Sequence, residues 1–190
     1  HAVLWQDAHL WRPCISLNAA PDTISDPHLI ERLLLEIQRS GLEADQIIIE
    51  VLETTLINGA DDMAAINIDS LSECGVGLEL DDFGTGYSSL GYWRKLKFST
   101  IKVDRSFVMK MDAVAGSDGG IRCPNQQAIQ LVGAVISLGH SLGHEIVAEG
   151  VETDVQFEEL KRLGCDTYQG YLLARPMSAE AILERFSVNA

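Results

Sequence analysis

Short apolar runs alternate with amphipathic segments along most of this chain. The runs with the length and composition of buried β-strands span residues 13–19, 47–52, 76–81, 100–103, 145–148 and 166–173. The segments with apolar residues at helical spacing span residues 27–40, 62–73, 126–142, 153–163 and 179–186. Because strands and helices alternate with short connections, the pattern predicts a parallel β-sheet with helices packed against it.

Glycines mark the ends of several predicted helices. Gly41, Gly75, Gly143 and Gly164 each follow an amphipathic segment, which predicts left-handed C-caps at these positions. The glycine-rich residues 113–124 fit neither a helical nor a strand pattern, and we expect a flexible surface loop there.

Polar side chains stand at or just beyond the end of every predicted strand. They are Asn18, Glu50, Asp81, Asp82, Lys102, Glu149 and Gln169. A (β/α)8 barrel builds its active site in this way, whereas an open doubly wound sheet has a glycine-rich phosphate loop after its first strand, and this chain lacks one. The sequence therefore predicts an α/β, TIM-like (β/α)8 barrel. Only six strands are found, so we expect the first strands of the barrel to be absent from this chain.

The adjacent pair Asp81 and Asp82 is the strongest chemical signal. Two neighbouring carboxylates repel each other and lose solvation when buried, so a cation or hydrogen-bond donors must compensate them. Oxygen ligands without a histidine or cysteine pattern favour Mg²⁺ or Mn²⁺. The alternative is an Asx turn or a helix N-cap that carries a spare acid.

Composition narrows the class of protein. The chain has 190 residues, of which 46% are hydrophobic, and a formal net charge of −14, so we expect one soluble domain over residues 1–190. The acidic balance argues against binding of a nucleic-acid polymer, and no apolar run is long enough to insert into a membrane. The four cysteines (Cys14, Cys74, Cys123 and Cys165) are widely spaced, which favours reduced thiols and a cytoplasmic location. Since the first residue is His1, we expect the chain to begin inside a longer protein, which could itself be membrane-anchored.

Six segments together resemble the EAL-domain family of bacterial phosphodiesterases, which hydrolyse cyclic di-GMP. The segments are SLN at 16–18, EVLE at 50–53, DDFGTGYSSL at 81–90, KVDRSF at 102–107, AEGVET at 148–153 and QGY at 169–171. The resemblance runs in order from about Cys14 to the C-terminus. It implies a metal-dependent phosphodiesterase that converts cyclic di-GMP to linear pGpG, with two Mg²⁺ or Mn²⁺ ions in each active site.

The resemblance also implies residue roles. Asn18, Glu50 and Asp81 match ligands to the first metal, and Asp81 matches a bridge to a second metal that Asp82 and Glu149 help to hold. Lys102 matches a lysine that hydrogen-bonds the nucleophilic water, and we expect it to act with Glu149 and Glu53 as the catalytic set. Glu53 matches the anchor of the loop at residues 83–89. The expected substrate contacts are Gln169, Phe83 and Gly84. The family further implies a homodimer and fused sensory or diguanylate-cyclase domains upstream.

The chain departs from the family pattern at several places, one of which is the loop at 113–124, which is longer than usual. No Glu-Ala-Leu tripeptide, whose glutamate binds the first metal, occurs in residues 1–12; either those strands exist in the natural protein and are missing from this chain, or the domain is truncated. Leu52 replaces a common threonine, and Leu173 stands where an aromatic residue is frequent. Two other functions stay open: a cyclic di-GMP receptor without catalysis, and a purely structural dimerisation module.

Overall fold

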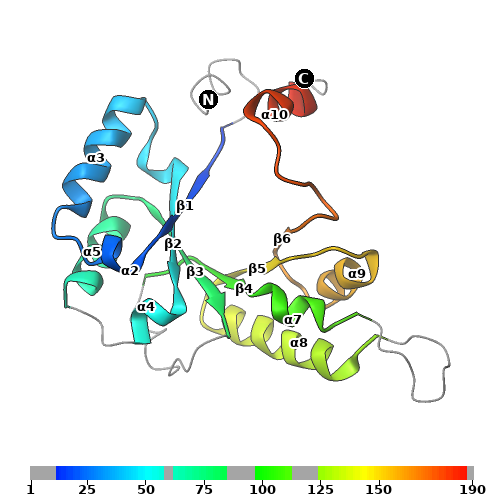
Figure 1. Cartoon of the computed structure of the whole chain (residues 1–190). Helices are drawn as coiled ribbons and strands as arrows, with labels where there is room; N and C mark the ends of the chain where they lie inside the picture. The colour runs from blue at the N-terminus through cyan, green and yellow to red at the C-terminus, as the bar shows by residue number, and fades with distance from the viewer. Residues whose placement is uncertain (1–11, 58–61, 85–96, 113–123, 188–190) are drawn as a thin grey trace.

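A single parallel β-sheet forms the centre of the molecule. The computed structural model describes residues 12–57, 62–84, 97–112 and 124–187. Within these residues the sheet has six strands in the order of the chain: β1 (Ile15–Ala19), β2 (Ile47–Leu52), β3 (Gly77–Phe83), β4 (Thr100–Val103), β5 (Glu145–Glu149) and β6 (Thr167–Gln169). Every neighbouring pair is parallel, and the sheet curves as part of a (β/α)8 barrel (Figure 1). The predicted fold class is confirmed.

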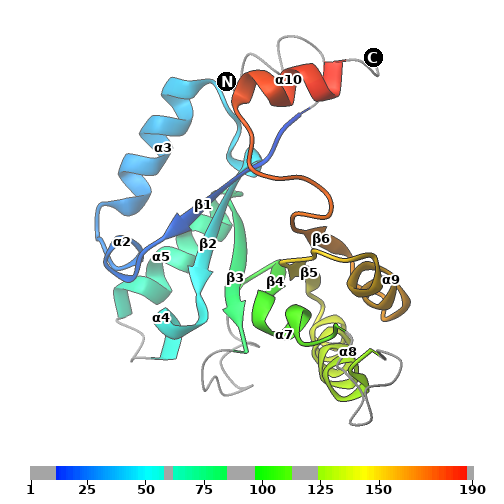
Figure 2. The ribbon, with the colours of Figure 1, turned by 45° about the vertical axis from the view of Figure 1, so that its right-hand side comes forward.

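Helices connect the strands and cover the outer face of the sheet. The longer helices are α3 (Leu29–Ser40), α5 (Asp62–Glu73), α8 (Gln126–Ser141), α9 (Asp154–Arg162) and α10 (Ala179–Ser187). The shorter ones are α2 (Pro21–Ile24), α4 (Glu53–Ile57), α7 (Arg105–Met109) and the 3-10 turn η1 (Ala44–Gln46). Helices α3, α5, α8 and α9 lie along the outside of the curved sheet, while α10 lies apart from that layer, near the start of β1 (Figures 1 and 2).

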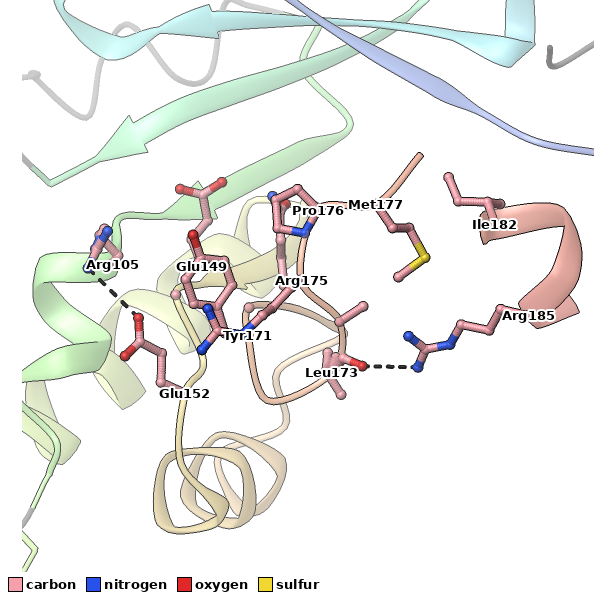
Figure 3. Close-up of a pocket in the computed structure, with 14 residues that line it drawn as sticks. Arg105, Glu149, Glu152, Tyr171, Leu173, Arg175, Pro176, Met177, Ile182 and Arg185 are labelled. Atoms are coloured by element: carbon pink, nitrogen blue, oxygen red, sulfur yellow. Dashed lines mark hydrogen bonds and ion pairs between the residues drawn. The ribbon is translucent and has the colours of Figure 1, made fainter. Parts of the chain in front are cut away.

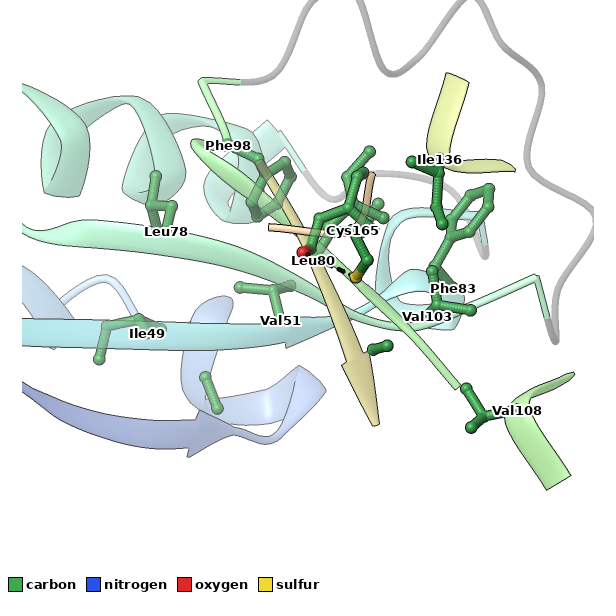
Figure 4. Close-up of a cluster of buried hydrophobic side chains, with 14 of the residues drawn as sticks. Ile49, Val51, Leu78, Leu80, Phe83, Phe98, Val103, Val108, Ile136 and Cys165 are labelled. Carbon is green, nitrogen blue, oxygen red and sulfur yellow. Dashed lines mark hydrogen bonds between the residues drawn. The ribbon is translucent and has the colours of Figure 1, made fainter. Parts of the chain in front are cut away.

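Alternating side chains divide the sheet into an apolar outer face and a polar inner face. On the outer face, residues such as Val51, Leu80 and Ile146 are buried against the helices, and Figure 4 shows part of this core. On the inner face, the parallel register places Asn18 beside Glu50 and Glu50 beside Glu79. The apolar side chains whose burial drives folding therefore lie mainly on the outer face of the sheet, and the inner face can carry charged side chains.

The glycine caps form as the sequence predicts. Gly41, Gly75, Gly143 and Gly164 have φ values of 73°, 83°, 85° and 82°, which lie in the left-handed region. These residues end helical segments without the steric cost that a side chain would bring. The predicted loop at 113–124 falls almost wholly outside the described residues.

Strand β6 is shorter than the predicted strand at 166–173. It ends at Gln169 because the chain turns at Gly170, where the amides of Leu173 and Ala174 both donate to the Gly170 carbonyl. Gly170 also packs directly on the backbone of Val151, so closely that a Cβ atom would overlap the Val151 amide and carbonyl. This close approach needs glycine, and it fixes the end of β6 against the segment after β5.

Gly170→Ala is expected to lower the free energy of unfolding by about 1–3 kcal/mol or more, because its new Cβ meets backbone rather than a flexible side chain. The Val151 backbone cannot retreat cheaply, since its amide donates to Gln169 and its carbonyl accepts from Leu172, each at 3.0 Å. Gly133→Ala is the matched control: its Cβ would meet only the tip of Leu163, at 2.9 Å, so we expect a change within about 1 kcal/mol. Urea unfolding of both variants tests this, and equal losses would contradict it.

Candidate metal and active site

A bulge at the end of β3 brings two adjacent aspartates to the same site. Leu80 pairs with Ile101 and Phe83 pairs with Val103, so Asp81 and Asp82 together oppose the single residue Lys102. Asp82 has a φ of 54°, the one described non-glycine residue with a positive value. In a regular strand these side chains would point to opposite faces, but the bulge turns the second one back.

Three carboxylates converge as a result. Ligand oxygens of Asp81, Asp82 and Glu149 all lie within 4.8 Å of one another, which is a spacing that a metal ion could bridge. Asp81 is buried, and Asp82 and Glu149 are partly buried. Among the residues that the structure describes, this is the one acidic cluster with such a spacing. Hard divalent cations prefer this kind of all-oxygen donor set.

Lys102 lies at the centre of the acidic residues. Its Nζ atom lies 2.7 Å from a carboxylate oxygen of Glu149, 2.8 Å from one of Glu50 and 3.2 Å from one of Asp81. The lysine side chain is only 4% exposed, so these contacts are screened little by water. The ammonium group therefore serves as a shared counter-ion for three acids from three strands.

Burial and charge act on the pKa values of the cluster in opposite directions. Burial alone would lower the pKa of Lys102, but its contacts with Glu149, Glu50 and Asp81 outweigh that effect and raise it. Burial raises the pKa of Glu149, and burial together with the charge of Asp81 raises the pKa of Asp82. The lysine thus stays charged at neutral pH, while the two acids hold protons more tightly than ordinary carboxyl groups do.

The remaining predicted metal ligands lie on the neighbouring strands. Glu50, which is 8% exposed, is connected to the cluster through Lys102, and Asn18 lies next to Glu50 in the register of β1 and β2. Asn18 itself is exposed. The structure thus brings all the predicted ligands to the same end of neighbouring strands, with Asp81, Asp82 and Glu149 in the tightest group.

The residues predicted to shape the loop after β3 divide into two kinds. Glu53, at the start of α4, is 2% exposed and accepts a 2.9 Å hydrogen bond from the amide of Gly84. Phe83 is 7% exposed and belongs to the apolar core, so any ligand contact there would have to come from its main chain. Residues 85–96, which include most of the loop expected at residues 83–89, lie outside the described residues.

A cavity of about 780 Å³ opens beside the acidic cluster. Glu149 and Gln169, which pair in the register of β5 and β6, both line it. Figure 3 shows Arg105 and Glu152 on one side of this cavity and Ile182 and Arg185 on the other. The Arg175 guanidinium lies over the Tyr171 ring, 4.6 Å from its centroid. Cationic, aromatic and apolar groups therefore face the same space that Glu149 enters.

Two residues lie in this region of the structure although they were not predicted from the sequence as part of the site. Glu79 lies on the inner face two residues before Asp81, and burial raises the pKa of its carboxyl group. Arg105 begins α7, separated from the end of β4 by one residue, and lines the cavity. The two-residue period of a strand was the signal available for Glu79, and the position just beyond a strand end was the signal for Arg105.

The chain is similar in sequence and in fold to known proteins. The family model described as EAL domain matches residues 3–176. The bifunctional diguanylate cyclase/cyclic di-GMP phosphodiesterase MucR of Pseudomonas aeruginosa is 41% identical over 95% of the chain, which spans only 24% of that protein. A solved structure of PaMucR phosphodiesterase in complex with c-di-GMP is 38% identical, with a TM-score of 0.83 over 95% of this chain and 68% of that one. The manganese/cy-diGMP complex of Klebsiella pneumoniae BlrP1 is 29% identical, with a TM-score of 0.74 over 91% of this chain and 41% of that one.

Lys102→Met should destabilise the protein by about 3–5 kcal/mol in the presence of a metal chelator, because it leaves several buried acids without their counter-ion. Denaturant unfolding measures this loss. Lys97→Met is the matched control, since Lys97 is 47% exposed and pairs only at the surface with Asp69 and Glu73; its loss should stay within about 1 kcal/mol. Similar losses in both variants would show that Lys102 does not balance the acids.

Proposed function

This chain belongs to the EAL domain family, and we propose that it hydrolyses cyclic di-GMP to linear pGpG at the acidic cluster. The observation that carries the proposal is the convergence of Asp81, Asp82 and Glu149 beside the buried ammonium group of Lys102. A phosphodiester is anionic, so an acidic site can bind it only if cations reverse the local potential. This requirement connects the acids, the cations and the substrate in one hypothesis.

We assign the cation sites to the strand-end residues. Asn18, Glu50 and Asp81 would hold a first Mg²⁺ or Mn²⁺ ion, and Asp81, Asp82 and Glu149 a second. The donor set supports this, because three carboxylates within 4.8 Å of one another match the preference of hard divalent cations. When bound, such ions lower the pKa of a coordinated water and neutralise charge on a phosphoryl oxygen.

The protein's own groups have distinct proposed roles. Lys102 would hydrogen-bond the attacking water and offset negative charge that develops on the phosphate, since its raised pKa keeps it protonated. Glu53 would hold the loop after β3 through Gly84, with which it shares a 2.9 Å hydrogen bond. Gln169 would contact the substrate from the end of β6, where it lines the cavity.

The cavity supports a nucleotide as the ligand. Its volume of about 780 Å³ lies within the usual range of small-molecule sites, roughly 300–1,000 Å³. Arg105 and Arg175 supply positive charge next to the acidic edge, and Tyr171 supplies a ring surface. A ligand with both phosphates and aromatic bases can contact the arginines and the aromatic ring directly, and the acids through bound cations.

Among the described residues, none of the helices combines the length and apolar character that membrane insertion needs. The homodimer, the fused sensory or diguanylate-cyclase domains and the cytoplasmic location stay predictions.

Asp82→Asn is expected to reduce formation of pGpG at least roughly 100-fold, because it removes one carboxylate from the cation site while keeping its size. Incubation of the protein with cyclic di-GMP and Mn²⁺, followed by chromatography of the products, measures this. Asp69→Asn is the control, since Asp69 is 54% exposed and pairs with Lys97 at the surface. Tight binding of cyclic di-GMP without any pGpG from the wild-type protein would instead support the receptor function.

Mn²⁺ should bind more weakly as the pH falls into the range where Glu149 and Asp82 take up protons, because protons compete with Mn²⁺ for these two acids, whose pKa values are raised above the ordinary carboxyl values. Below a raised pKa the carboxyl group is protonated in the free protein, so each displaced proton costs about tenfold in affinity per pH unit. Calorimetric titration at several pH values measures the slope. Asp82→Asn removes one titrating group and should flatten it, and a pH-independent affinity would contradict the assignment.

A further inference from the structure

We propose that Phe107 of α7 is a positioning residue for the cation-binding acids, acting through Gly84 at the end of β3. This inference rests on the proposed function, because it concerns the same acidic cluster. Phe107 ends the KVDRSF segment, but neither the strand-end pattern nor the family resemblance assigns it a role. Its contact with Gly84 is what singles it out.

The Phe107 ring lies directly against the α-carbon of Gly84. A Cβ atom built on Gly84 would lie 2.7 Å from Cζ and 2.8 Å from Cε2 of this ring, which is closer than real Cβ contacts. Gly84 also has a φ of 93°, a conformation that side chains disfavour. The position is therefore glycine for two reasons, and the ring occupies the space that a side chain at this position would need.

A second group holds Gly84 by its amide. The Gly84 amide donates a 2.9 Å hydrogen bond to the buried carboxylate of Glu53. The residue is thus held by a carboxylate from α4 and by an aromatic ring from α7. These two contacts define where the chain goes immediately after the bulge.

The bulge is the part of the site that most needs such support. Asp82, two residues before Gly84, has a φ of 54°, and this unusual conformation directs its carboxylate to Asp81 and Glu149. A non-glycine residue keeps a positive φ only where its surroundings impose it. If Gly84 could move toward α7, Asp82 could relax to ordinary strand geometry and leave the cluster.

Helix α7 is itself held in position by its N-cap and by a buried side chain. It follows β4 after one residue, Asp104, whose carboxylate caps the helix by accepting a 3.0 Å hydrogen bond from the Ser106 amide. Val108, the next residue after Phe107, is fully buried. Strand β4 therefore positions Lys102 beside the acids, and the helix that follows it positions the Phe107 ring against Gly84. Because only one residue separates β4 from α7, the positions of these two side chains depend on each other.

The test compares Mn²⁺ affinity and kinetics in Phe107→Ala with those in Phe157→Ala. Phe157 is a partly buried ring on α9 that packs on Tyr168 at a centroid distance of 4.9 Å, so its loss controls for the removal of an aromatic contact alone. We expect Phe107→Ala to weaken Mn²⁺ binding by roughly 10- to 100-fold and to lower kcat more than it changes KM. Phe157→Ala should lower the melting temperature by a similar amount and leave the affinity unchanged.

A double-mutant cycle tests the contact itself. Gly84→Ala should weaken Mn²⁺ binding strongly in the wild-type background and less in the Phe107→Ala background, where the ring no longer meets the new methyl group. Phe107→Leu, which keeps apolar bulk at the position, should restore part of the affinity. Equal effects of Gly84→Ala in both backgrounds, or wild-type affinity in Phe107→Ala, would overturn this inference alone. Absence of Mn²⁺ binding by the wild-type protein would overturn the proposed function and this inference with it.

Discussion

One buried ammonium group balances the negative charge around which this site is built. Lys102 lies within 3.2 Å of carboxylate oxygens from Glu50, Asp81 and Glu149, and no water-rich surroundings dilute these contacts. Without a positive partner, acids at this spacing would take up protons or move apart. Because Lys102 supplies that partner, the acids can stand in place before any divalent cation arrives. The electrostatic free energy needed to bring the acids together is therefore supplied during folding. Binding of a divalent cation then requires less rearrangement of the site.

At the bulge in β3, the backbone adopts an unfavourable conformation that the geometry of the site requires. A left-handed conformation at Asp82 costs on the order of 1–3 kcal/mol, and a strand without the bulge would avoid it. A regular strand, however, would send the Asp82 carboxylate to the apolar outer face, where neither water nor Lys102 could reach it. Local conflicts of this kind concentrate at functional sites, where the surrounding fold imposes them. Here the surrounding groups are Glu53 and Phe107, which both hold Gly84.

The sequence predicts the sheet and most of the site because both depend on the regular spacing of apolar and polar residues along strands and helices. Alternation along a strand and glycine after a helix are local signals, and they locate Glu50, Glu149 and the C-cap at Gly41 correctly. Contacts between distant segments leave no such signal. The end of β6 at Gly170 depends on the Val151 backbone, and the burial of Phe83 depends on a bulge that shifts its direction. The role proposed for Phe107 likewise needs the packing of α7 on β3.

Charge in the site is separated into two regions, and this arrangement limits what the cavity can bind. The acids stand at the ends of β3 and β5, whereas Arg105 and Arg175 come from α7 and from the segment after β6. A simple cation would be attracted to the acids and repelled by the arginines, and a simple anion would behave in the opposite way. A ligand that brings phosphate to the arginines and to acid-bound cations satisfies both regions at once. The net charge of −14 therefore does not oppose a nucleotide ligand, because the charge that matters is the local one.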